Sequence, residues 1–181
     1  MRKLIPDLIC ASVFDIDFGD LKKRKISGLL VDIDNTLVPW GEPEMEEAFI
    51  HWVRKAQKEG FAICLVSNAK RPRAQSFADL LGIPAVGLAL KPLGRAFRKG
   101  MALLNLKPHE VAVVGDQLFT DVFGGNRLGI YTILINPISR NELDSTKMMR
   151  KLERRMLERM VRRGDISPQL AQIRQGSDYD E

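Results

Sequence analysis

Short apolar runs alternate with longer stretches of helical periodicity along this chain, and this alternation constrains the fold more than any other feature. Each run ends in polar residues, and the five runs are 29–31, 61–66, 85–90, 111–114 and 131–135. Strands that alternate with helices at these lengths form a parallel sheet with helices on both faces. The sequence therefore predicts an α/β fold, a three-layer Rossmann-like parallel sheet of five strands.

Between the runs, apolar residues recur at the i, i+3, i+4 spacing of helices that bury one face. This spacing predicts four helices, at 43–59, 72–81, 93–104 and 121–128. Residues 1–20 carry a shorter set with the same spacing, which predicts a docking segment that covers one edge of the core. We expect three parts: a main domain over 1–140, a basic amphipathic helix over 141–163, and a polar, mobile tail over 164–181.

Composition indicates a globular protein of a reducing compartment. Hydrophobic residues make up 45% of the chain and charged residues 28%, which is ordinary for a globular domain. The two cysteines, Cys10 and Cys64, provide neither a disulfide framework nor a CxxC metal site. No apolar run reaches membrane-spanning length, and Asp7 and Asp15 interrupt the run that a signal peptide needs. We therefore expect a cytoplasmic location.

Two carboxylates follow the first apolar run directly. Asp32 and Asp34 project to the same side of an extended chain, so they converge where the strand ends. Carboxylates this close repel unless one is protonated or a cation lies between them, which suits a divalent metal beside a nucleophilic acid. The pair alone fits an ordinary solvated turn equally well. A calcium-binding loop is excluded, because Leu37 occupies the position where that loop needs glycine.

Polar groups also follow three other predicted strands. Ser67 and Asn68 follow the second strand, Lys91 the third and Asp116 the fourth. Ligands of parallel sheets bind outside the carboxyl ends of the strands, so this pattern indicates an active site at one edge. Taken singly, Ser67 and Asn68 fit a turn or helix cap, and Lys91 fits a solvated surface residue. Asp121 fits the acid of a helix start as well as it fits a catalytic acid.

Acids and one lysine at such an edge can carry out phosphoryl transfer. Asp32 is placed to attack phosphorus and form an aspartyl-phosphate, which water then hydrolyses. Asp34 can protonate the departing alkoxide and later deprotonate the attacking water. Lys91 and the Ser67 hydroxyl can stabilise charge on the transferred phosphoryl oxygens.

Oxygen ligands suited to Mg²⁺ lie at the same edge. Asp116, with Asp32 and a backbone carbonyl, can hold the ion, which offsets repulsion between the nucleophile and an anionic phosphate. Asp121 is expected to support the metal site or to orient Lys91. We predict Asp32, Asp34 and Lys91 as catalytic, Ser67, Asn68 and Lys91 as phosphate-binding, Asp32, Asp34 and Asp116 as metal-binding, and Asp121 and Thr36 as supporting residues.

These residues form ordered motifs that resemble those of the haloacid dehalogenase superfamily: DIDNT at 32–36, Ser67-Asn68, Lys91-Pro92, and Gly115-Asp116 followed by Asp121. The resemblance implies a Mg²⁺-dependent phosphatase that works through an aspartyl-phosphate. More narrowly, LIPDL, DIDNTLVPW, KPLGRAF and GDQLFTDVFGGNR resemble the YqeG-like group of subclass IIIA phosphatases. That group includes phosphatidylglycerophosphate phosphatases, which implies a lipid phosphate as substrate.

The spacing of the motifs leaves no room for a cap domain. One helix and one strand fill the chain between Asp34 and Ser67, and another such pair fills it between Ser67 and Lys91. We therefore expect an open site, which can approach a large or membrane-embedded phosphate or be covered by another subunit.

The segment 147–163 holds the basic character of the chain. It has eight basic and two acidic residues, a net charge of +6, whereas the whole chain carries +5. Its apolar side, rich in methionine, can dock on the core, or it can lie with the basic residues on an anionic bilayer. Both interpretations can hold for different faces. No RNA-binding motif or aromatic platform accompanies the segment, which argues against contact with nucleic acid.

Three functions remain open at this point. The preferred one is a Mg²⁺-dependent phosphatase that converts phosphatidylglycerophosphate to phosphatidylglycerol, in peripheral contact with the inner face of the membrane. The alternative is a phosphatase of a soluble phosphorylated metabolite or of a nucleic-acid end. The third is a non-catalytic adaptor that binds RNA or a protein through the basic helix.

Overall fold

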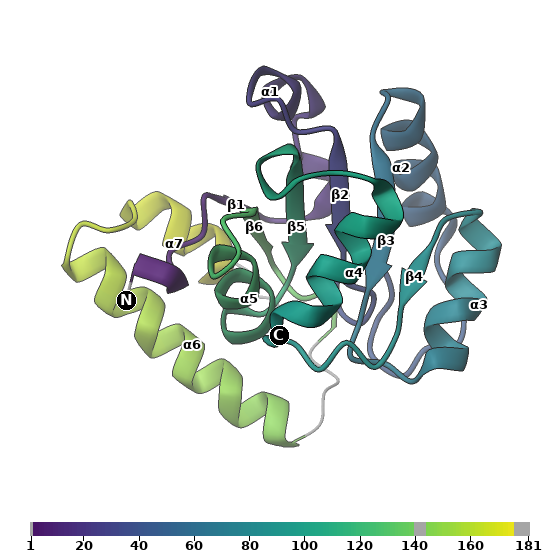
Figure 1. Cartoon of the computed structure of the whole chain (residues 1–181). Coiled ribbons are helices and arrows are strands. Elements are labelled where there is room, and N and C mark those ends of the chain that lie inside the picture. Colours follow the sequence, from purple (N-terminus) through teal and green to yellow (C-terminus); the bar gives the residue numbers. More distant parts are fainter. Residues whose placement is uncertain (1, 140–143, 176–181) are drawn as a thin grey trace.

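Six parallel strands form one sheet in the computed structural model, which describes residues 2–139 and 144–175 (Figure 1). Their order across the sheet is β1-β6-β5-β2-β3-β4. The strands are β1 (Leu8–Cys10), β2 (Gly28–Val31), β3 (Ala62–Val66), β4 (Ala85–Val86), β5 (Val111–Gly115) and β6 (Tyr131–Ile135). Because β2 lies between β5 and β3, the residues that follow these three strands meet at the carboxyl edge.

Helices cover both faces of the sheet (Figure 1). The helices are α1 (Phe18–Lys23), α2 (Glu47–Lys58), α3 (Arg71–Leu81), α4 (Gly94–Leu104), α5 (Phe123–Asn126), α6 (Asp144–Arg162) and α7 (Pro168–Gln175). Leu29 and Val31 of β2 pack in the cluster that also contains the apolar sides of α1, α2 and α3. Leu30, which points to the other face, packs in the cluster with α4. The fold therefore has the three layers that the sequence predicts.

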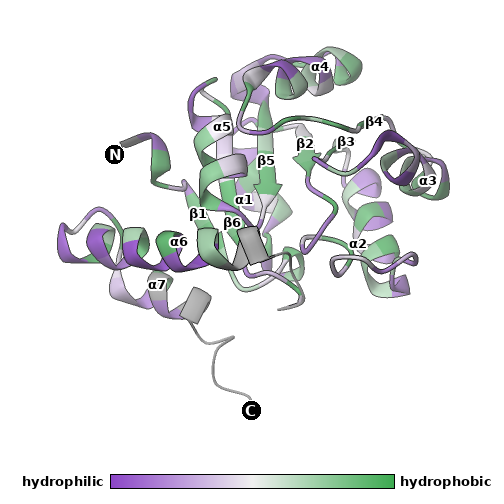
Figure 2. Cartoon of the chain, turned by 90° about the horizontal axis from the view of Figure 1, so that it is seen from below, coloured by the Kyte–Doolittle hydropathy of each residue, from purple (hydrophilic) through white to green (hydrophobic). Residues whose placement is uncertain are grey.

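The helices after β6 pack on the β1 side of the sheet. Leu157 and Met160 of α6 are buried with Ile9 of β1 and Leu134 of β6. Ile166, between α6 and α7, is buried in the same cluster. Coloured by hydropathy in Figure 2, the strands are green, whereas α6 carries both green and purple residues along its length. The predicted docking of the C-terminal helix on the core is therefore confirmed for this face of α6.

The N-terminal segment differs from its prediction as a helical docking element. Residues Leu8–Cys10 form β1, a strand that was not predicted. It pairs with Ile133–Ile135 of β6. Asp7 fixes this register, because its carboxylate accepts hydrogen bonds from the Thr132 N–H (2.8 Å) and hydroxyl (3.0 Å). Pairing with a distant strand outweighs the local helical spacing, and a single-sequence pattern carries no signal for it.

Two further boundaries differ. β4 ends at Val86 rather than at residue 90, and Leu88 and Leu90 then adopt positive φ angles of 50°, which no regular strand contains. The segment 168–175, predicted as part of a mobile tail, forms α7, where the Ser167 hydroxyl accepts a hydrogen bond from the Leu170 N–H. Residues 140–143 and 176–181 lie outside the described part of the chain.

The part of the chain that the structure describes contains no cap domain, as predicted. The chain forms only α2 and β3 between Asp34 and Ser67, and only α3 and β4 between Ser67 and Lys91. Among the residues that the structure describes, no helix has both the length and the apolar character needed to cross a bilayer.

Candidate active site

The structure gathers three buried carboxylates at the carboxyl edge of the sheet. Asp32 follows β2, Asp116 follows β5, and Asp121 lies on the π-helical turn η4 (Leu118–Val122). Each offers one oxygen, and these oxygens lie within 4.8 Å of one another. The carboxylate of Asp34, which was predicted to bind the metal, is not part of this cluster.

Lys91 joins this cluster as a buried cation. Its Nζ lies 2.8 Å from Asp32 Oδ1 and 2.6 Å from Asp121 Oδ1, and its side chain is only 2% exposed. Its main-chain N–H donates to Asn68 Oδ1 at 2.7 Å, which ties the loop after β4 to the loop after β3. Lys91 Nζ therefore contacts Asp121 and Asp32 at the same time.

Burial sets the acid–base properties of the cluster. Desolvation raises the pKa of Asp32 from 3.8 to about 7, with Asp121 and Asp116 adding to the rise and Lys91 opposing it. Desolvation likewise raises the pKa of Asp121. Burial acts to lower the pKa of Lys91, but the carboxylates of Asp121 and Asp32 outweigh it and raise that pKa well above 10.5. Burial thus disfavours the ionised forms of Asp32 and Asp121, and the ionised form of Lys91 is favoured by its contacts with them.

This donor set fits a divalent metal ion. Mg²⁺ prefers carboxylate oxygens and relieves repulsion among acids that are held close together. Asp32 and Asp116 can bind such an ion, whereas both oxygens of Asp121 accept hydrogen bonds, Oδ1 from Lys91 Nζ and Oδ2 from the Gln117 N–H. The Thr36 hydroxyl, which is fully buried, lies 3.5 Å from Asp116 Oδ1.

Gly115 leaves room for the cluster. A Cβ atom at this position would lie 2.3 Å from Asp121 Cγ, far inside van der Waals contact. Only glycine therefore lets the carboxylate of Asp121 pack against the end of β5.

The other predicted residues lie around the cluster with different partners. The Ser67 hydroxyl accepts a hydrogen bond from the Ala69 N–H at 3.0 Å, which is the local turn contact considered for it. Asp34 pairs with Arg73 of α3, whose Nε and Nη2 lie 3.1 and 2.9 Å from Oδ1. Sequence reasoning missed Arg73, because a basic residue in the first turn of a surface helix carries no signal of its partner.

Helix α6 also reaches the cluster, which sequence reasoning missed. Arg150 Nη1 donates to the main-chain oxygen of Asp116 at 2.6 Å, and Nη2 pairs with Asp116 Oδ2. Glu153 is 1% exposed and accepts hydrogen bonds from the N–H groups of Leu118 (2.6 Å) and Phe119 (3.4 Å). The one available signal was an acid within the otherwise apolar face of the helix.

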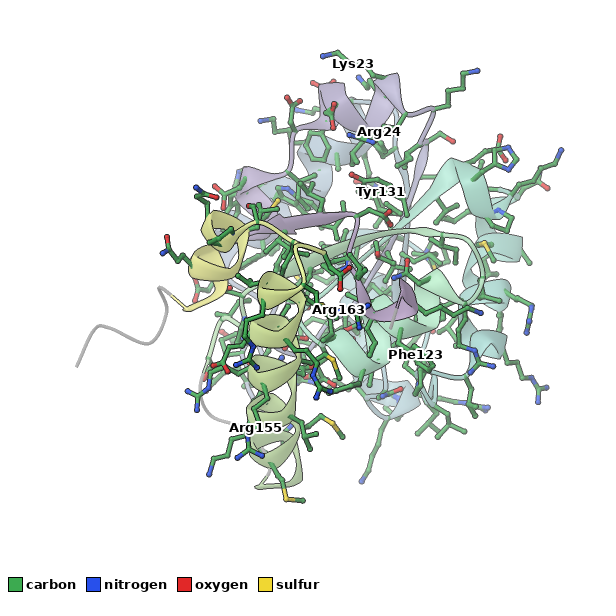
Figure 3. All side chains as sticks on the ribbon, turned by 90° about the vertical axis from the view of Figure 1, so that its left-hand side faces the viewer. Lys23, Arg24, Phe123, Tyr131, Arg155 and Arg163 are labelled. Carbon is green, nitrogen blue, oxygen red and sulfur yellow. The ribbon has the colours of Figure 1, made fainter. Side chains whose placement is uncertain are left out.

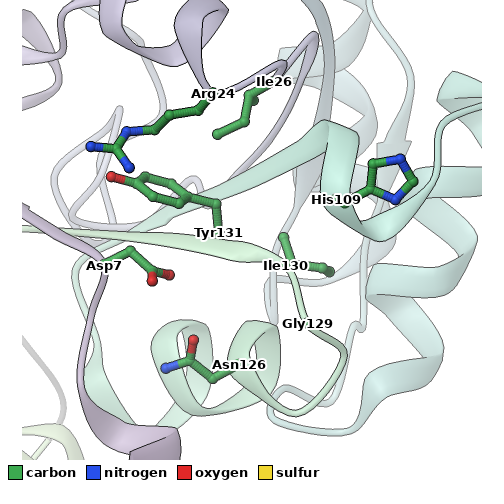
Figure 4. A pocket seen from close by; sticks show the side chains of 8 residues that line it. All are labelled: Asp7, Arg24, Ile26, His109, Asn126, Gly129, Ile130 and Tyr131. Carbon is green, nitrogen blue, oxygen red and sulfur yellow. The ribbon is translucent and has the colours of Figure 1, made fainter.

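A separate cavity of about 320 Å³ lies at the opposite edge of the sheet (Figure 4). Asp7, Ile26 and Ile130 precede β1, β2 and β6, which places this cavity at the amino ends of the strands. The Arg24 guanidinium lies over the Tyr131 ring, 5.2 Å from its centroid. The cavity contains none of the predicted site residues.

Comparison with known proteins identifies the family of this chain. Residues 42–129 match the haloacid dehalogenase-like hydrolases. The chain is 38% identical to the probable phosphatase YqeG of Bacillus subtilis over 162 residues, which cover 90% of this chain and 94% of that protein. It is 28% identical to the mitochondrial phosphatidylglycerophosphatase GEP4 of Saccharomyces cerevisiae, over 76% of this chain and 87% of that protein. It is 26% identical to phosphatidylglycerophosphate phosphatase 1 of Arabidopsis thaliana, over 89% of this chain but 49% of that protein.

Solved structures share the fold. The cobalt-bound deoxy-D-mannose-octulosonate 8-phosphate phosphatase of Haemophilus influenzae superposes with a TM-score of 0.52 at 14% identity, over 76% of this chain and 90% of that one. An uncharacterized protein of Listeria monocytogenes gives a TM-score of 0.51 at 16% identity, over 70% and 99%. With the match over 42–129 and the similarity to YqeG along most of its length, this chain belongs to the haloacid dehalogenase-like hydrolases and is a phosphatase of that family.

Proposed function

We propose that this phosphatase removes the terminal phosphate of phosphatidylglycerophosphate, with Mg²⁺ as cofactor. The proposal rests on one observation above all: Asp32, Lys91 and two further acids are buried together at the carboxyl edge, in a chain without a cap. Asp32 attacks phosphorus and forms an aspartyl-phosphate as the phosphorus–oxygen ester bond breaks. Asp34 protonates the departing alkoxide, then takes a proton from the water that hydrolyses the intermediate.

The remaining groups neutralise charge, bind the phosphate and orient Asp34. Mg²⁺ would be held by Asp32 and Asp116, with the Asp34 carbonyl as a further ligand, and would neutralise charge between phosphate and nucleophile. Lys91 stabilises the phosphoryl oxygens, and Ser67 and Asn68 bind phosphate at the neighbouring loop. Arg73 orients the Asp34 carboxylate, since two of its N–H groups donate to Oδ1.

A groove beside these loops supports an anionic amphiphile as substrate. The groove has a volume of about 660 Å³ and includes the apolar side chains of Leu88, Leu90 and Leu93, which are about half exposed or more. Three basic residues, Arg71, Arg95 and Lys99, line the groove, and no acidic residue does. Such an exposed apolar patch indicates a binding surface, and its cationic lining complements a phosphodiester.

The groove adjoins the phosphate-binding loops. The N–H groups of Leu88 and Ala89 donate to the main-chain oxygens of Ala69 and Ser67, at 2.8 and 3.0 Å. Lys91 follows Leu90 directly in the sequence. The leaving group of a phosphate ester bound at Asp32 can therefore lie along the leucines of the groove. The names of the relatives in yeast and Arabidopsis support the same lipid as substrate.

Removing two cations from the groove is expected to weaken binding of the lipid substrate and to leave the phosphoryl-transfer step unchanged. For Arg95→Gln with Lys99→Gln, we expect KM for phosphatidylglycerophosphate in mixed micelles to rise by roughly tenfold, since each lost contact to a diester costs about 0.5–1 kcal/mol. The kcat/KM for a small aryl phosphate should stay within twofold. Arg54→Gln with Lys58→Gln, on exposed positions of α2, is the matched control.

The outcomes separate substrate from enzyme class. An equal loss of activity on the lipid and on the aryl phosphate would show that the groove does not bind the lipid substrate. Hydrolysis of soluble esters alone by the wild type would contradict the lipid substrate and favour the soluble-metabolite alternative, while the phosphatase chemistry would stand. Phosphate release must disappear in Asp32→Asn, which controls for contaminating phosphatases.

We also propose that α6 contacts an anionic membrane. Beyond its docked residues, α6 leaves Met148, Met149 and Leu152 exposed by 41–67%. The exposed cations Arg155 and Arg159 follow Leu152 at helical spacing and share its side of the helix, which runs down the front of the molecule in Figure 3. An apolar strip flanked by cations is the surface that an amphipathic helix presents to a charged bilayer.

Vesicle flotation tests this contact. Each basic residue near an anionic surface contributes about 1 kcal/mol, so Arg155→Gln with Arg159→Gln is expected to weaken binding to phosphatidylglycerol vesicles roughly 30-fold. The Arg54→Gln with Lys58→Gln variant carries the same loss of charge elsewhere and should bind like the wild type. Equal weakening in both variants would mean that net charge, rather than α6, drives the binding.

A further inference from the structure

We propose that α6 completes the active site: Arg150 is a positioning residue that holds Asp116 in the orientation needed to bind the metal ion. The inference relies on the Mg²⁺ site proposed at Asp32 and Asp116, and it is independent of the lipid substrate. It assigns to a helix outside the α/β core a part in the phosphatase reaction.

Arg150 contacts Asp116 at two points, the main chain and the carboxylate. Nη1 donates to the main-chain oxygen at 2.6 Å, and Nη2 pairs with carboxylate Oδ2. On the other side, Oδ1 lies 3.5 Å from the Thr36 hydroxyl. One planar guanidinium therefore fixes both the peptide and the carboxylate plane of Asp116, which leaves Oδ1 on the Thr36 side of the carboxylate. A lysine could supply the charge but not this fork.

Glu153 holds Arg150 and the loop together. Its Oε2 lies 3.2 Å from Arg150 Nη1, one helical turn away, while Oε1 accepts the N–H groups of Leu118 and Phe119. A carboxylate buried to 1% exposure is costly unless it is paired and hydrogen-bonded. If α6 only packed on the sheet, an apolar side chain would serve better at this position. Glu153 instead fixes the chain segment that follows Asp116.

Mg²⁺ needs ligands that are held in a defined orientation, and the contacts of Arg150 supply this for Asp116. The ion demands near-octahedral geometry, so a ligand carboxylate that rotates freely binds it poorly. Hydrogen-bond partners behind metal ligands typically contribute about 10–100-fold to metal affinity. Arg150 occupies that place for Asp116.

Mg²⁺ binding to the substrate-free protein tests the assignment. In calorimetric titration, we expect Arg150→Gln to raise the dissociation constant for Mg²⁺ by about tenfold. The half-saturating Mg²⁺ concentration in the phosphatase assay should rise by the same factor, with KM for substrate at saturating Mg²⁺ within twofold of wild type. Arg150→Lys, which keeps the charge without the fork, should lose at least about threefold in Mg²⁺ affinity. Arg162→Gln, an exposed position on α6, should bind Mg²⁺ like the wild type.

Opposite results are equally informative. Tighter Mg²⁺ binding by Arg150→Gln would show that the guanidinium competes with the metal for Asp116, and unchanged binding would show that it only docks the helix; either overturns the assignment. Should Arg150→Gln fail to give a cooperative thermal transition, Arg150→Lys decides alone: unchanged affinity overturns the assignment. A wild type that binds no Mg²⁺ also overturns it, and this result needs no substrate.

Discussion

Asp32→Asn is expected to lower phosphatase turnover by about 10⁴-fold or more, because asparagine cannot form the aspartyl-phosphate. The same change is expected to raise the thermal stability of the metal-free protein at pH 8. Asp32 is buried beside Asp116 and Asp121, and its pKa is raised from 3.8 to about 7, so its ionised form is unfavourable in the fold. Activity and stability should therefore move in opposite directions.

The pH dependence of this effect has a definite sign. Between pH 4 and 7 the folded protein binds a proton at Asp32 more tightly than the unfolded chain does, so stability falls as pH rises through this range. Without metal, the melting temperature of Asp32→Asn should exceed that of wild type at pH 8, and the difference should shrink toward pH 5. Asp79→Asn, at an exposed position of α3, should show no such trend. A pH-independent difference would mean that Asp32 is not the titrating group.

Lys91→Met is expected to cost about 3 kcal/mol of unfolding free energy, because it leaves two buried carboxylates without their cation. Lys91 Nζ contacts both Asp32 and Asp121, and all three side chains are at most 8% exposed. Turnover should fall by about 10³-fold, since the phosphoryl oxygens lose a preorganised positive charge. Urea unfolding at pH 8 and steady-state kinetics measure the two effects.

A double substitution separates charge from packing. Lys91→Met with Asp121→Asn removes the cation together with one of its partners, so it should recover part of the lost stability without recovering turnover. Lys58→Met, at an exposed position of α2, should change neither quantity. If the double variant were less stable than Lys91→Met, repulsion among the acids could not be the cause of the destabilisation.

The central part of the fold was predictable because local patterns and tertiary packing agree there. β2, β3 and β5 are buried on both faces, so they read as apolar runs, and the polar residues that follow them have to meet at one edge. The meeting of Asp32, Lys91 and Asp116 follows from topology alone. That Asp121 rather than Asp34 completes the carboxylate cluster depends on how the chain bends after Asp116, which sequence spacing does not encode.

The periphery was less predictable because its structure depends on distant partners. Leu8–Cys10 are extended only because β6 offers a free edge, and Arg150 reaches Asp116 only because α6 docks beside β1. Periodicity identified the apolar side of α6 but could not choose between the sheet and a bilayer. The structure assigns Leu157 and Met160 to the sheet and leaves Met148, Met149 and Leu152 outside.

The edge strand β1 has a consequence for synthesis of the chain. Its anchor, Asp7, hydrogen-bonds to Thr132, 125 residues later in the sequence. During synthesis β1 therefore leaves the ribosome long before β6. Its apolar residues cannot pair with β6 until that strand has been made. Such distant pairing slows folding and exposes a strand to misassociation. The segment of β1 is thus one that a chaperone could protect during synthesis.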